Sequence, residues 1–111
     1  MTIEMLKAFG ANVQDGLNRC MNNEDFYLRM VQMAVHDAAF EQLGSALHEG
    51  DLDKAFEEAH KLKGVAGNLA LEPIYAPVSE LTELLRHKTP GDYEALYALI
   101  AQKKEELVSL L

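Results

Sequence analysis

The stretch of residues 52–71, LDKAFEEAHKLKGVAGNLAL, decides the fold that this sequence predicts. Its apolar residues recur at intervals of three or four positions, the spacing of one face of an α-helix. They are Leu52, Ala55, Ala59, Leu62, Ala66 and Leu69. Gly50 and Asp51 form a break just before this stripe. The sequence therefore predicts a long helix over residues 52–70 with a narrow, alanine-rich inner face.

The flanking segments have the same helical periodicity, and none shows the alternation of a strand. Short helices are expected over residues 2–9 and 13–21, the second capped by Asn12. Asn22 and Asn23 then cap a long segment that is expected to bend near Asp37. Its apolar stripe is Phe26, Met30, Met33, Phe40, Leu43 and Leu47, with both methionines interpreted as core residues.

The C-terminal third predicts two more helices. The first has Pro73 in its first turn, buries Ile74, Val78, Leu81 and Leu85, and ends in cations over residues 86–88. Pro77 predicts either a kink in it or a later start. Thr89 and Pro90 predict the N-cap and first residue of a final helix with Tyr93, Leu96, Tyr97, Ile100 and Leu107 inward. We expect an all-α fold, an antiparallel four-helix bundle with short N-terminal helices.

Length and composition exclude several classes of protein. With 111 residues, the chain is expected to form a single domain over residues 1–111. Its net charge of -8 and scattered cations argue against nucleic acid as a ligand, and no apolar run is long enough to span a bilayer. Cys20 is the only cysteine and cannot form an internal disulfide, which together with the lack of a signal peptide predicts a cytoplasmic protein. Cys20 itself is interpreted as a small buried residue.

His60 is the residue for which we expect a function. It lies about 130° from the centre of the apolar stripe, so it should face water. Lys63, Gly64 and Gly67 follow it at i+3, i+4 and i+7 and share its face of the helix. Each glycine inside a helix costs roughly 1 kcal/mol relative to Ala, and no predicted turn requires either one. A close approach by another molecule would account for both.

The residue types on this face suit a phosphorylated histidine. An exposed imidazole is largely neutral at pH 7, so a ring nitrogen can act as a nucleophile without a second base. Lys63 can place an ammonium group near an anion on the ring, and Lys61 adds positive potential from the neighbouring position.

The segment from His60 to Gly64, HKLKG, followed by Gly67 and Asn68, resembles the histidine phosphotransfer (HPt) domains of multistep phosphorelays. The stretch from Asp15 to Leu28 is similar to that family's entry into its long second helix. Family members often carry a further glycine where this chain has Ala70, a departure that affects the helix end more than the face of His60.

The resemblance implies a phosphocarrier that is not itself an enzyme. His60 would accept a phosphoryl group from an aspartyl phosphate on one receiver domain and pass it to an aspartate on another. Lys63 would contact that group, while Lys61, Gly64, Gly67 and Asn68 would contact the group or the partner. The implied partners are response-regulator receiver domains and a hybrid sensor kinase, with the chain itself a monomer. No cofactor or metal is expected on this chain, and Mg²⁺ would come from the receiver.

Two alternatives stay open. One is a non-catalytic helical adaptor that binds a signalling partner. The other is a carboxylate and histidine metal site, because Glu57 and His60 have the i, i+3 spacing of di-iron bundles. Such a site needs a second pair and further inward carboxylates, which the chain does not supply. His48 and His87, at predicted helix ends, and His36, in mid-helix, are interpreted as structural or incidental, and Phe56 as a core residue beside the His60 face.

Overall fold

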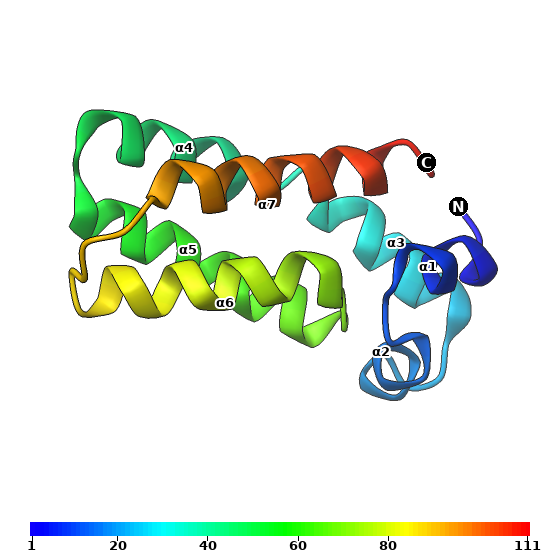
Figure 1. Cartoon of the computed structure of the whole chain (residues 1–111). Helices are drawn as coiled ribbons and strands as arrows, with labels where there is room; N and C mark the ends of the chain where they lie inside the picture. The colour runs from blue at the N-terminus through cyan, green and yellow to red at the C-terminus, as the bar shows by residue number, and fades with distance from the viewer.

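The computed structural model covers residues 1–111 and contains seven α-helices and no strand (Figure 1). The helices are α1 (Ile3–Phe9), α2 (Val13–Arg19), α3 (Glu24–Ala34), α4 (Ala39–Glu49), α5 (Leu52–Asn68), α6 (Glu72–Arg86) and α7 (Tyr93–Val108). Asparagine caps begin α2 and α3 as predicted: the Asn12 and Asn23 side chains accept hydrogen bonds from the backbone N–H groups of Asp15 and Phe26. The expected all-α fold is confirmed.

The four C-terminal helices form the bundle. Helix α5 packs against α4 and α6, and α7 packs against α6 and α4. Figure 1 shows these four helices side by side along the long axis, with α1 and α2 gathered beyond the end where α5 turns into α6. The whole chain measures 40 × 23 × 20 Å. None of its helices combines the length and apolar composition that crossing a membrane requires.

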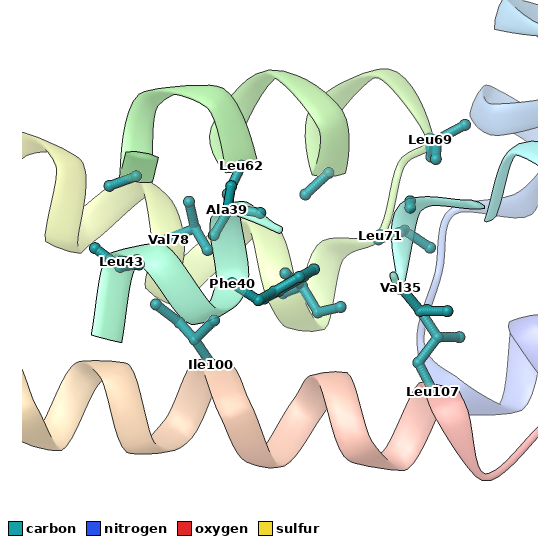
Figure 2. Close-up of a cluster of buried hydrophobic side chains, with 14 of the residues drawn as sticks. Val35, Ala39, Phe40, Leu43, Leu62, Leu69, Leu71, Val78, Ile100 and Leu107 are labelled. Atoms are coloured by element: carbon teal, nitrogen blue, oxygen red, sulfur yellow. The ribbon is translucent and has the colours of Figure 1, made fainter. Parts of the chain in front are cut away.

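The core contains 24 buried residues and extends from the space between the bundle helices to residues of α1 and α3. In Figure 2, Leu43 of α4, Leu62 of α5 and Ile100 of α7 lie in this cluster. The predicted α5 stripe is buried from Ala55 to Leu69, and only Leu52 is half-buried. A fully buried leucine contributes about 2 kcal/mol, so this face fixes how α5 is rotated within the bundle. The opposite face of α5 is consequently turned to solvent.

Helix α3 differs from the prediction. Its buried residues are Tyr27, Val31 and Ala34, whereas Met33 is 62% exposed and the core role expected for it is wrong. The chain leaves the helix at Val35, and the Asp37 carboxylate accepts a hydrogen bond of 2.8 Å from the Ala39 N–H to start α4. The chain therefore changes direction near Asp37 as expected, but the predicted single bent segment is two separate helices. Because these two helices have different axes, one apolar stripe could not describe both.

The start of α6 and the start of α7 could not be decided from the sequence. Helix α6 begins at Glu72 and runs through Pro77, so the later start is excluded. The N-cap of α7 lies three residues after the predicted one, because Asp92, not Thr89, accepts the hydrogen bond of the first turn. The Thr89 N–H donates to the Leu84 carbonyl and closes the end of α6. Thr89 thus belongs to the previous helix and cannot open the next one.

Candidate functional site

His60 is exposed on the outer face of α5, as its angular position predicted. Its imidazole stacks on the Phe56 ring one turn earlier, with centroids 5.7 Å apart and an interplanar angle of 18°. The Arg86 guanidinium of α6 lies 5.0 Å from the centroid of the same Phe56 ring. Phe56 is half-buried between core and surface. One face of the imidazole is thus supported by an aromatic neighbour, which limits the orientations of the ring.

A cavity of about 470 Å³ opens beside His60 between α2, α5 and α6. Its walls are polar and charged apart from one aromatic ring. The lining residues are Asp15, Arg19, His60, Lys63, Gly64, Gly67, Asn68, Glu72 and Tyr75. All the predicted site residues except Lys61 meet here, as expected for positions spaced i, i+3, i+4 and i+7 on one helix.

Lys61 lies apart from this cavity. Its ammonium nitrogen is 3.3 Å from Oε1 of Glu58, whose carboxylate is only 5% exposed. An almost buried carboxylate requires a partner, and Lys61 is the cation that supplies it. The position of Lys61 is therefore explained by an ion pair within the helix.

Lys63 is the cation on α5 that reaches the cavity. Its ammonium nitrogen lies 3.9 Å from Oε1 of Glu83 on α6, and its side chain is 28% exposed. Glu83 also pairs with Arg86 at 3.3 Å and approaches His87 at 3.8 Å. Because Lys63 and Arg86 share one exposed carboxylate, the ion pair between Lys63 and Glu83 is weak, and a stronger anion can take the place of Glu83.

The two glycines of the site differ in their surroundings. A Cβ atom built on Gly64 would meet nothing within 4 Å, whereas one on Gly67 would lie 3.2 Å from Cε2 of Tyr75. Packing of α6 against α5 therefore accounts for Gly67 in part, a reason that the sequence did not reveal. No internal contact accounts for Gly64, which leaves the surface next to His60 open to another molecule.

Sequence reasoning missed four residues of the cavity wall: Asp15, Arg19, Glu72 and Tyr75. The only local signal was the i, i+4 spacing of Asp15 and Arg19, which predicts an ion pair but not its place in the molecule. These two residues form the pair, with 3.2 Å between Nε of Arg19 and Oδ2 of Asp15. Their presence beside His60 depends on how α2 packs.

The remaining histidines lie elsewhere. His48 is in the last turn of α4 and His87 is the residue after α6, as predicted, while His36 lies in the break between α3 and α4 and not in mid-helix. Glu57 and His60 are both exposed, and nowhere on the chain do three or more His, Cys, Asp or Glu residues gather in a way that could hold a metal ion.

Comparison with protein families matches residues 29–109 to the Hpt domain. The chain belongs to the Hpt domain family. The match spans α4 to α7 and most of α3, and it includes every residue of the predicted site from His60 to Asn68. It leaves out α1 and α2, and with them Asp15 and Arg19. Comparisons with curated proteins and with solved structures gave no significant match.

Membership of this family gives the chain a phosphotransfer role in phosphorelays. Hpt domains are phosphocarrier modules that interact with receiver domains and kinases, and they are not enzymes of the ordinary kind. The resemblance seen in residues 60–68 is confirmed at the level of the family.

Proposed function

We propose that His60 is the phosphoacceptor of a relay between receiver domains. A neutral ring nitrogen attacks the phosphorus of an aspartyl phosphate, the N–P bond forms, and the P–O bond to the aspartate breaks. The bonding electrons leave with the aspartate carboxylate, and the attack is reversed when a second receiver's aspartate takes the group. The observation that carries this proposal is the exposed imidazole beside the open surface at Gly64.

The neighbours of His60 have separate roles in this proposal. Lys63 exchanges its weak pair with Glu83 for the phosphoryl oxygens, which carry more negative charge. Gly64 leaves room for the partner's backbone, and Gly67 and Asn68 extend the same docking surface along α5. Lys61 lies outside the cavity and stays paired with Glu58, so its role is to contact the partner and not the phosphoryl group.

The receiver supplies the catalytic groups and the Mg²⁺, and this chain supplies the nucleophile and its setting. A hybrid sensor kinase is the upstream partner, and the chain acts as a cytoplasmic monomer. Such an arrangement is consistent with a site on an outer helix face, because water reaches that face freely until a partner covers it.

The test is phosphoryl transfer from a labelled receiver domain. Wild-type chain is expected to gain an acid-labile, alkali-stable label, and H60Q is expected to gain none. The matched control is H48Q. His48 is also exposed but lies in the last turn of α4, so this variant should be labelled like wild type. Labelling of H60Q would overturn the proposal. A wild-type chain that binds the receiver but takes no label would identify an adaptor.

Lys63→Ala separates the role of the ammonium group from that of the fold. Lys63 makes one long ion pair with an exposed carboxylate, so its loss should change the free energy of unfolding by less than about 0.5 kcal/mol. Transfer in the same assay should nevertheless be slower. An unchanged transfer rate would remove Lys63 from the mechanism.

A further inference from the structure

Helix α2 forms one wall of the His60 cavity, although it lies outside the residues that match the family. It is held against the end of α5 by backbone and side-chain contacts. The Asn12 N–H donates to the Ala70 carbonyl at 2.9 Å, and the buried Tyr27 hydroxyl donates to the Leu69 carbonyl at 2.8 Å. Tyr27 also packs against Gly16 in the middle of α2. The wall is thus a fixed part of the fold.

Arg19 is the only cation that this wall contributes to the cavity. In the resting chain its guanidinium is paired with Asp15 of the same helix, and the two side chains are 52% and 43% exposed. Exposed pairs of this kind contribute little to stability, so a stronger anion can displace Asp15 at small cost. Arg19 is consequently an exchangeable donor, not one committed to the fold.

Phosphorylation of His60 would change the charge balance of the cavity. The charged side chains that line the cavity are two cations, Arg19 and Lys63, and two carboxylates, Asp15 and Glu72. A phosphoryl group adds nearly two negative charges and three acceptor oxygens. Lys63 alone cannot offset that charge, and a guanidinium can bind two phosphoryl oxygens at once.

We propose that Arg19 leaves Asp15 and contacts the phosphoryl group on His60 as a second cation, opposite Lys63. The inference rests on the proposed function of His60 and adds a residue to it. It makes α2 part of the phosphoryl-binding site, so that the phosphorylated and resting chains present different charges on that wall. In the phosphorylated chain, Asp15 is left without its partner.

The phosphoryl group itself is the best reporter of this contact. With His36, His48 and His87 replaced by glutamine in every variant, so that His60 is the only imidazole, the chain can be phosphorylated with phosphoramidate, a small chemical donor that needs no receiver, and the phosphoryl pKa can be followed by ³¹P NMR. A nearby cation lowers that pKa, so R19Q should raise it by roughly half a unit at this exposed site. In transfer from a labelled receiver, R19Q should also shift the equilibrium about threefold away from the phosphohistidine.

Arg29→Gln is the matched control, because Arg29 is an exposed arginine on α3 that lies outside this cavity. It removes the same charge and should leave the phosphoryl pKa unchanged. R19K keeps a positive charge with a different shape and should restore part of the shift. D15N frees Arg19 and should lower the phosphoryl pKa, with a smaller effect when Arg19 is already replaced by glutamine.

The outcomes distinguish this inference from the function on which it rests. If wild-type chain takes no phosphoryl group from either donor, the proposed function is overturned and the inference with it. If His60 is phosphorylated and R19Q has the same phosphoryl pKa and transfer equilibrium as wild type, only the role of Arg19 is overturned. Equal shifts in R19Q and R29Q would likewise overturn it, since they would indicate a general effect of net charge.

Discussion

Two glycines in the middle of helices, Gly16 of α2 and Gly64 of α5, have opposite surroundings. Gly16 is buried, and a Cβ atom there would lie 2.5 Å from the Tyr27 ring and hydroxyl. At Gly64 a Cβ atom would meet nothing within 4 Å. Both residues weaken their helix by roughly 1 kcal/mol relative to Ala. The first glycine is required by packing inside the chain, and the second by nothing inside it.

The same comparison separates glycines that packing requires from glycines that it does not require. Gly44 is like Gly16, because a Cβ atom there would lie 2.5 Å from the Tyr97 hydroxyl, which itself donates to the Phe40 carbonyl. Gly67 is intermediate, with Tyr75 at 3.2 Å. Gly64 is the one beside His60 whose cost the fold does not offset, so we attribute it to the partner.

Gly16→Ala should give the largest effect. The new methyl group would displace Tyr27, which is fully buried and hydrogen-bonded to the Leu69 carbonyl. Overpacking together with a weakened buried hydrogen bond predicts a loss of about 3 kcal/mol in the free energy of unfolding. Urea denaturation followed by circular dichroism measures it. A loss below about 0.5 kcal/mol would mean that the contact with Tyr27 does not explain this glycine.

The buried Tyr27 hydroxyl also makes the stability of the chain depend on pH in the alkaline range. Burial raises the pKa of Tyr27 to about 12 from the ordinary value of 10.0, with smaller contributions from Cys20 and Asp15. Because the folded pKa is the higher one, the unfolded chain loses this proton first. The contribution of the protonated Tyr27 hydroxyl to the free energy of unfolding is therefore complete below pH 10 and is lost as the pH rises through 12.

Comparison of wild type with Tyr27→Phe isolates this effect. The phenylalanine variant cannot ionise at this position, so the stability advantage of wild type should shrink by about 2 kcal/mol between pH 9 and pH 12. Denaturation curves of both proteins across that range measure the difference. A constant difference would show that the hydroxyl ionises as easily in the folded chain as in the unfolded one.

Gly64→Ala should give the smallest change and one of opposite sign. Alanine has open space there and a better helix propensity, so the free energy of unfolding should rise by up to about 1 kcal/mol. Phosphoryl transfer from a receiver should become slower, and Gly64→Leu should slow it roughly tenfold or more, because a larger side chain overpacks the docking surface. Normal transfer in Gly64→Leu would contradict the steric explanation of this glycine.

The helices themselves were largely predictable, because caps and apolar spacing are local features. The α5 stripe and the Asn12 and Asn23 caps are present as expected. The errors concern features that depend on neighbouring elements. Met33 is exposed because the chain breaks into two helices with different axes, so that the apolar stripe of α4 does not continue along α3. Thr89 closes α6 because its N–H reaches the Leu84 carbonyl. A cap residue in sequence does not tell which of two adjacent helices it serves.

The candidate site was predictable only along α5. Residues 60, 63, 64 and 67 share a face through helix geometry alone, and the structure brings all of them to one cavity. Lys61 was placed near them by the same reasoning, but Glu58 accounts for its position. Nothing in residues 13–19 indicates that α2 faces His60, because that arrangement depends on the packing of Tyr27 against Gly16 and on the hydrogen bond to Leu69.

The sequence by itself determined an all-helical chain. It also determined that the motif over residues 60–68 places an exposed histidine next to a lysine and a glycine. Those properties follow from the 3.6-residue period, which relates positions within one helix without reference to any other. Only the tertiary structure decided that Arg19 and Asp15 line the same cavity as His60, that Tyr75 accounts in part for Gly67, and that no contact within the chain accounts for Gly64. These are distances between elements far apart in the chain, and they are set by which side chains fit together in the core.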